Sequence, residues 1–272
     1  MRAVAAAIGL ASGACGSLSA MADAPPATAT AEDRLVFSAD GSTLSGDGGG
    51  SGGSATWLHY FSPDTVLGGG AEYQRIANAH WTTGTVTGSV GLGQSQAKPR
   101  LYAEIHEGAG DIDTRGFHYL LAVAGVFGTL TPRLSLQLEE RRIDIDTSHG
   151  NLPKLALLFK FTPHLLATAS YAYSVGGNLG TRLTALRLDY TGSEFGGMAG
   201  VVWGPAAPAV FDLFGQSLSP GTSLTEGFAG FGKLVGRTTW LVVGDYQNVA
   251  GTRRATITVT CAHTLRGHGQ LQ

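Results

Sequence analysis

Apolar and polar residues alternate along much of the chain with the period of two that is typical of β-strands. Between positions 134 and 141, leucines fill the even positions as far as Leu138 and polar side chains fill the odd ones. Between 117 and 127 the odd positions apart from Gly125 are large and apolar, whereas the even positions include His118. This pattern predicts an all-β fold in which the two faces of each strand meet different environments.

Two Thr-Pro turns indicate a repeated hairpin. Thr131-Pro132 and Thr162-Pro163 lie 31 residues apart (162 minus 131), and each follows an apolar segment that contains a phenylalanine near its end. Proline fixes φ and lacks the N–H that would continue a strand ladder, so both dipeptides favour a chain reversal. Because the same unit fits nearly the whole chain, we predict one domain rather than two.

The alternating segments and the turn residues between them predict about 14 strands, with about 12 as the alternative count. The predicted strands are 35–39, 57–61, 66–75, 81–93, 101–107, 117–127, 134–145, 155–161, 165–174, 183–190, 195–203, 224–234, 238–246 and 253–262.

The lengths of the apolar runs favour strands as the membrane-crossing element. No run reaches the ~18 consecutive apolar residues of a membrane helix, and the longest, at 119–130, includes Thr129 and two glycines. Only helices and closed barrels satisfy every backbone hydrogen bond in hydrocarbon. We therefore predict an up-and-down antiparallel transmembrane β-barrel, with the odd positions of 117–127 toward lipid. We expect interfacial aromatic girdles from Trp57, Trp81, Tyr173, Tyr190, Trp203 and Trp240.

The predicted connections form two sets that alternate along the chain. One set is short and covers 62–65, 94–99, 130–133, 162–164, 192–194 and 235–236. We expect the other set to be longer, as at 47–53 and 108–114, because short periplasmic turns and longer external loops are typical of outer-membrane barrels. The longest loop, 204–221, is apolar around Phe211 to Phe214. We expect it either to fold into the barrel mouth as a constriction or to extend the flanking strands.

The first 22 residues have the pattern of an export signal. Arg2 precedes an apolar run, and Ala20-Met21-Ala22 is the small-x-small pattern that a signal peptidase reads. The predicted order is a signal peptide at 1–22, a periplasmic lead-in at 23–34, the barrel at 35–266 and a tail at 267–272. After cleavage only Cys261 would remain, which excludes an intramolecular disulfide.

The repeated proline turns and alternating strands of the whole mature chain resemble those of bacterial outer-membrane β-barrel proteins and, more loosely, the YaiO-type barrels. The resemblance is architectural and carries over no functional residue. It implies a location in the outer membrane after export, with outer-membrane lipid, lipopolysaccharide and the barrel-assembly machinery as partners. A nucleic-acid partner is excluded, because a chain with net charge −2 and 14% charged residues lacks clustered Lys and Arg. No oligomeric state is predicted.

Charged residues at the predicted inward positions are the candidate functional groups. Opposite charges on neighbouring strands can either pair across the lumen and fill it, or line a watery path that selects solutes. The lumen-lining candidates are Glu72, Glu104, His106, His118, Glu139, Arg141, Lys160, Arg187, Asp189, Glu226, Asp245 and Arg254.

Two acidic motifs recur 33 residues apart (144 minus 111) at the end where we expect the longer loops. Carboxylate oxygens are the ligands that Ca²⁺ and Mg²⁺ prefer. The candidate metal ligands are Asp111, Asp113, Asp144 and Asp146, unless these acids are simply solvated. No other cofactor is predicted.

We expect a passive pore or a component of envelope or exopolysaccharide export, without catalysis. A lipid-modifying enzyme is a competing interpretation, for which Ser148 and His149 are adjacent residues of suitable type. The Gly-x-Ser-x-Gly string at 49–53 lacks the strand-to-helix context of a nucleophile elbow, so we interpret it as a linker. A structural barrel with a plugged lumen and a soluble periplasmic barrel would also fit the alternation.

Overall fold

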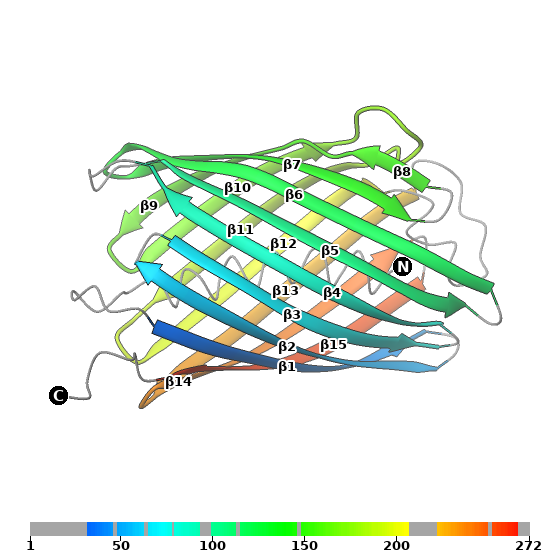
Figure 1. The fold of residues 1–272 in the computed structure, drawn as a ribbon. Coiled ribbons are helices and arrows are strands. Elements are labelled where there is room, and N and C mark those ends of the chain that lie inside the picture. The colour runs from blue at the N-terminus through cyan, green and yellow to red at the C-terminus, as the bar shows by residue number, and fades with distance from the viewer. Residues whose placement is uncertain are drawn as a thin grey trace.

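A computed structural model describes residues 32–45, 48–62, 65–77, 79–92, 99–112, 115–145, 148–206, 222–249 and 252–265. Its regular elements in these ranges are all strands, which tilt across one another around a common axis (Figure 1). The strands are β1 (Glu32–Leu44), β2 (Gly49–Ser62), β3 (Thr65–Ile76), β4 (Ala79–Gly91), β5 (Arg100–Ile112), β6 (Arg115–Thr131), β7 (Leu134–Ile145), β8 (Ser148–Asn151), β9 (Lys154–Thr162), β10 (Leu165–Tyr173), β11 (Arg182–Thr191), β12 (Phe195–Ala206), β13 (Thr222–Val235), β14 (Thr238–Val249) and β15 (Thr252–Thr264).

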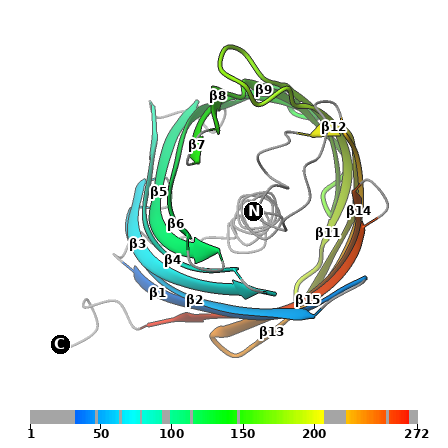
Figure 2. The same cartoon turned by 90° about the vertical axis from the view of Figure 1, so that its right-hand side faces the viewer.

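The strands close into a barrel of 14 antiparallel strands. Figure 2 shows the closed ring along the barrel axis. Strands adjacent in sequence pair with each other around the ring, and β1 closes it by pairing with β15 from Arg34↔Thr264 to Leu44↔Arg254. The four-residue β8 pairs only with β7 within the sheet, while β9 continues the ring. Each of the predicted strands corresponds to one strand of the ring, so the predicted fold is confirmed.

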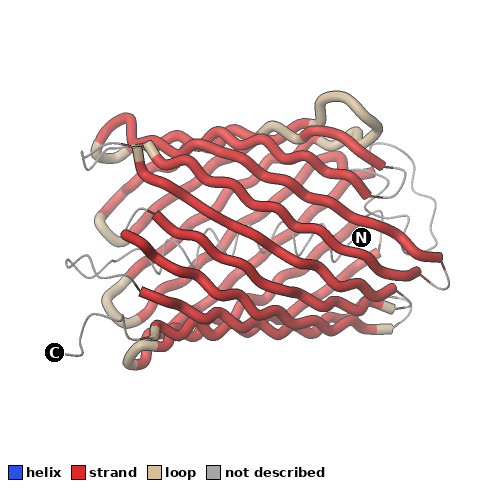
Figure 3. Tube along the Cα trace, viewed as in Figure 1, coloured by secondary structure: helices blue, strands red, loops and turns tan. Residues whose placement is uncertain are grey.

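We call the end where β1 begins and β15 ends the near end, and the opposite end the far end. Strands cover almost the whole length between the two ends (Figure 3). Among the described residues, no helix is long and apolar enough to cross a membrane.

The outer face is apolar and carries aromatic residues toward both ends. Exposed aromatic residues toward the near end are Phe37, Trp57, Phe61, Phe159, Phe161, Tyr190, Phe195, Phe231 and Trp240. Those toward the far end are Tyr73, Tyr171, Tyr173, Trp203 and Tyr246. Aliphatic side chains such as Leu186, Val201, Val242 and Ile257 are exposed between the two groups. An apolar band flanked by two aromatic girdles is the surface that a lipid bilayer requires of a barrel.

The sequence predicted the wrong face of β6 as the one that points into the barrel. Val123 pairs with Glu104 on one side and with Arg141 on the other, and both of those residues face inward. Phe117, Tyr119 and Leu121 therefore lie on the inner wall, where they are buried with Trp81 and do not contact lipid. The even positions of β6, from Leu120 to Val126, are also apolar. Both faces of this strand are thus apolar, so the alternation could not decide which face is inside. Trp81 is accordingly no girdle residue.

The predicted difference in length between the two sets of connections was also wrong in most places. At the far end, the strand bounds leave two residues each between β3 and β4, β5 and β6, and β14 and β15, the same number as between β2 and β3 and between β6 and β7. The expected loops at 47–53 and 108–114 are largely strand, because β2 begins at Gly49 and β5 runs to Ile112. The connections after β7, β10 and β12 are the long ones at this end, and the first of them contains β8.

Several predicted segments lie outside the described residues. They are the signal peptide at 1–22, the lead-in at 23–31, the tail at 267–272, and residues 207–221 with Phe211 to Phe214. β1 includes Glu32 to Arg34, which the sequence assigned to the lead-in.

Candidate functional site: the inner wall of the barrel

Most of the predicted lumen-lining residues lie on the inner wall. Neighbours in a β-ladder point to the same face, and the exposed apolar side chains identify the outer one. By this criterion the inward residues are Glu72, Glu104, His106, Glu139, Arg141, Lys160, Arg187, Asp189, Glu226, Asp245 and Arg254. His118 is an exception and lies on the outer face beside Glu107, with an Nε2 to Oε1 distance of 3.3 Å. Because the neighbouring Phe117 and Tyr119 point inward, the alternation along β6 places His118 on the outer face.

Glu139 is the centre of a buried charge network on β5, β7 and β9. Its side chain is 4% exposed and forms ion pairs with Arg141 and with Lys154, whose Nζ lies 3.7 Å from Oε1. The Tyr102 hydroxyl donates to Oε2 at 2.7 Å, and the Gln137 amide donates to the same oxygen at 3.1 Å. One carboxylate therefore compensates two cations and accepts hydrogen bonds from two neutral groups.

A glycine on β6 makes room for this network. A Cβ added at Gly125 would lie 2.3 Å from the ring and hydroxyl atoms of Tyr102, which crosses β6 to reach Glu139 on β7. The tyrosine thus lies along the wall instead of projecting across the lumen. This contact explains glycine at a strand position where it otherwise weakens the sheet.

Four basic side chains face inward on β7, β9 and β11, and we call them the basic arc: Arg141, Lys154, Lys160 and Arg187. Two inward acids on the same strands compensate them in part. Glu139 contacts Arg141 and Lys154, and Asp189 accepts a hydrogen bond from Arg187 Nε at 2.8 Å. With four cations against two carboxylates, this wall has a positive balance.

Four acidic side chains face inward toward the far end of β1, β3, β13 and β14, and we call them the acidic arc: Asp40, Glu72, Glu226 and Asp245. At the near end of β1, the inward Glu32 forms an ion pair with Arg34 at 3.4 Å. Each acid of the arc lies four residues from the far end of its strand. Gln74 donates to Asp40 at 2.8 Å, and Gln247 donates to Glu226 at 3.1 Å. Arg254 on β15 is the basic residue within this arc. With four carboxylates against one guanidinium, this wall has a negative balance.

The two arcs face each other across the barrel. Six strands separate β1, in the acidic arc, from β9, in the basic arc, in either direction around the ring. Arg141 also lies four residues from the far end of its strand, as the four acids do. Opposed charges at one level create an electric field across the lumen.

The sequence missed Asp40 and Lys154 because both lie just outside the predicted strands. Asp40 follows the predicted end at 39, although Ser38, Asp40 and Ser42 continue one polar alternation. Lys154 precedes the predicted start at 155, and Tyr102 and Gln137 had no charge to single them out. Extending the alternation by a few residues at each strand end would have found the two charged ones.

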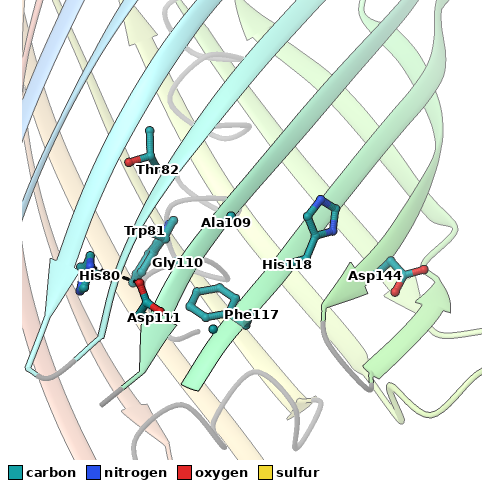
Figure 4. A pocket seen from close by; sticks show the side chains of 10 residues that line it. His80, Trp81, Thr82, Ala109, Gly110, Asp111, Phe117, His118 and Asp144 are labelled. Atoms are coloured by element: carbon teal, nitrogen blue, oxygen red, sulfur yellow. Dashed lines mark ion pairs between the residues drawn. The ribbon is translucent and has the colours of Figure 1, made fainter. Parts of the chain in front are cut away.

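A second feature is a pocket of about 740 Å³ at the far end of β4 to β7, lined by residues of both faces, including the inward Trp81 and Phe117 (Figure 4). His80, Asp111, His118 and Asp144 line it, and His80 Nε2 lies 3.6 Å from Asp111 Oδ2. Asp144 pairs with Arg142 at 3.4 Å. Two of the four predicted metal ligands, Asp111 and Asp144, thus line one pocket from β5 and β7 with β6 between them, whereas Asp113 and Asp146 lie outside the described residues. Within the described ranges, no three His, Cys, Asp or Glu residues form a metal-binding group.

Metal binding by these acids stays a prediction with a direct measurement. If a site forms, Ca²⁺ at a hundred times its Kd should stabilise the barrel by about 2.7 kcal/mol. Thermal unfolding in detergent would then show a lower Tm in EDTA than in excess Ca²⁺, and Asp144→Asn should remove the difference. Glu194→Gln in a near-end turn is the matched control. Identical Tm values in EDTA and Ca²⁺ would exclude a site.

The candidate residues of a lipid-modifying enzyme lie on β8 and β2. Ser148 and His149 are consecutive residues of the four-residue β8. The His149 backbone N–H donates to Asn178 Oδ1 at 2.9 Å, which fixes the loop after β10 against β8. Gly49 to Gly53 lie within β2, so no nucleophile elbow exists there.

No protein-family model and no curated protein sequence matches the chain. Among solved structures, the CymD monoaromatic hydrocarbon channel is similar with a TM-score of 0.59 at 11% identity, over 87% of this chain and 88% of that one. Omp33, an outer membrane protein of Acinetobacter baumannii, has a TM-score of 0.52 at 11% identity, with coverage of 86% and 99%. The toluene transporter TodX of Pseudomonas putida has a TM-score of 0.51 at 7% identity, with coverage of 89% and 90%. At these identities the likeness is one of fold, and the fold is that of bacterial outer-membrane β-barrels.

Proposed function

We propose that the chain forms a passive outer-membrane pore for small polar or charged solutes. The observation that carries the proposal is the pair of charged arcs that face each other on the inner wall of a barrel whose outer face is apolar. A polar interior behind a lipid-facing band is the arrangement of water-filled barrels.

The distribution of the inner charges favours a water-filled path over a filled lumen. Burying unlike charges stabilises a core only when they pair closely. Here β1 and β9, at the centres of the two arcs, lie six strands apart on opposite walls, so the charges on these two strands cannot neutralise one another by contact. Water and ions between the arcs would solvate both, and their field would act on any solute that passes.

The proposed location is the outer membrane, reached by export with residues 1–22 as the cleaved signal. Phospholipid, lipopolysaccharide and the assembly machinery are the proposed partners. A closer relation to the YaiO-type barrels and a role in polysaccharide export stay predictions from the sequence.

A second candidate is a channel for apolar solutes, which one observation favours. Ile76, Trp81, Phe117, Tyr119 and Leu121 form an apolar cluster on the inner wall toward the far end. Two of the fold-level neighbours are described as a monoaromatic hydrocarbon channel and a toluene transporter. For this candidate, proteoliposomes should take up toluene, and Leu121→Asp should abolish that uptake while ionic conductance persists.

Planar-bilayer recording tests the proposed pore. The refolded mature chain should produce discrete conductance steps that rise with KCl concentration, because ions cross through water between the arcs. A matched preparation of detergent and refolding buffer without protein is the control. A correctly folded barrel that inserts and stays electrically silent would contradict the proposal and favour a structural barrel with a filled lumen.

A further inference from the structure

The acidic arc contains buried polar atoms that lack hydrogen-bond partners. Asp245 Oδ1 and Gln74 Oε1 are such acceptors, and Arg254 Nε and Nη1 are such donors. Asp245, Gln74, Thr256 and Arg254 are each between 3% and 6% exposed. Buried polar groups in native proteins are nearly always hydrogen-bonded, so a group of unpartnered ones on adjacent strands needs an explanation.

The register brings these residues to one level of the wall. Asp245 pairs with Thr256 across β14 and β15, and Thr256 pairs with Ser42 on β1, whose hydroxyl is also without a partner. Arg254 is the inward residue next to Thr256 on the far-end side. The group therefore extends over three neighbouring strands as one polar surface.

Gln74 continues this surface across β2. A Cβ at Gly52 would lie between 2.2 and 2.3 Å from the amide atoms of Gln74, so a side chain at position 52 would displace the Gln74 amide from its place across β2. Its Nε2 donates to Asp40 on β1, which leaves Oε1 as a free acceptor beside the other groups. β2 contributes Gly50 and Gly52 at this level and no side chain that would cover the surface.

The net charge of this surface determines the sign of the charge that its ligand must carry. Four carboxylates face one guanidinium, so the surface attracts a cation. An ammonium group carries three N–H donors, which suits Asp245 Oδ1 and the neighbouring neutral acceptors. A bare metal ion would leave the free donors of Arg254 without a partner.

Arg254 sets a second requirement for the ligand, which must also supply hydrogen-bond acceptors. Its Nε and Nη1 donors need acceptor oxygens, and the described side chains around them supply none within hydrogen-bond distance. A solute that carries hydroxyl or carboxylate oxygens beside its amine satisfies the donors and the acceptors together. Glucose-sized amino sugars are one such class of compound.

From this geometry we propose that the acidic arc is a binding site for small amines that also carry acceptor oxygens, with Asp245 holding the amine and Arg254 holding an oxygen. The proposal rests on the proposed pore, because the site is on the inner wall. It makes the arc a selectivity element for solutes of this class.

Glucosamine and glucose test the site, because they differ by an ammonium in place of a neutral hydroxyl. In planar bilayers, glucosamine should reduce the KCl current saturably, and glucose at the same concentration should not. Asp245→Asn should raise the half-blocking concentration about tenfold, the effect of losing one charge-assisted hydrogen bond. Glu107→Gln, on the outer face, should leave the block unchanged.

Ethylamine separates the two roles, because it has the ammonium and no oxygen. Arg254→Gln should weaken the glucosamine block about tenfold, while block by ethylamine stays the same or strengthens. If Asp245→Asn does not fold, Glu226→Gln serves as the second variant with the same expected direction. Equal block by glucosamine and glucose in a conducting wild-type channel overturns the site and leaves the pore in place, whereas a silent barrel overturns the pore.

Discussion

Replacing Glu139 by glutamine is expected to destabilise the barrel by about 3 to 5 kcal/mol, the usual cost of removing one partner from a buried ion pair. Arg141 and Lys154 would both lose their carboxylate, and Arg141 is itself almost buried at 11% side-chain exposure. Tyr102 and Gln137 would lose their charged acceptor at the same time. Few single substitutions in the described chain remove so many partners.

Equilibrium unfolding in lipid vesicles, followed by tryptophan fluorescence over a denaturant titration, measures this effect. Glu107→Gln is the matched control, because the Glu107 and His118 side chains are more than 60% exposed and an exposed pair contributes about 0 to 1 kcal/mol. If Glu139→Gln unfolds at the same denaturant concentration as the wild type, the network is solvated in the membrane and the ion pairs contribute little.

A restoring variant sharpens this test. Substituting Glu139→Leu and Arg141→Met together removes the central charge pair without leaving the guanidinium unpaired. Lys154 is 24% exposed and can reach water, so we expect the double variant to be more stable than Glu139→Gln alone.

The sequence predicted the number and order of strands because turn residues and alternation are local signals. Thr131-Pro132 and Thr162-Pro163 do form turns, and the Thr131 hydroxyl accepts from the Leu134 backbone N–H at 3.0 Å. Alternation shows which face of a strand points into the barrel only when one of the two faces is polar. Leu134 to Arg141 meets that condition, whereas β6 does not.

The site was only partly predictable for a different reason. Burial and charge identify Glu139 or Asp245 as inward once the strand is known. Whether Asp245 lies level with Asp40 and Arg141 depends on the register of every strand between them, which no local pattern specifies. The free atoms of Arg254 and Gln74 likewise depend on how side chains cross glycines on neighbouring strands. The two opposed arcs could therefore be recognised only in the three-dimensional structure.

Leu186→Arg is expected to destabilise the folded state by about 2 to 4 kcal/mol in a bilayer, the range for arginine at the midplane of a lipid-facing strand. Leu186 is the fifth of ten residues in β11 and is 49% exposed on the outer face. Its cross-strand neighbours are Ala169 and Val201, so no acid is available to pair with the new charge. The guanidinium would have to remain in hydrocarbon or reach out of it.

The stability of Thr184→Arg, measured in the same vesicles, shows whether the cost of arginine depends on its depth in the bilayer. Thr184 shares the outer face of β11 but lies two residues nearer the far end, where the cost of arginine falls to about 0 to 1 kcal/mol. A bilayer thus predicts a large difference between two substitutions by the same residue on the same strand. In a soluble barrel both positions would face water and both variants would be nearly neutral. Equal stability of the two variants would therefore place the outer face in water and remove the basis for a membrane pore.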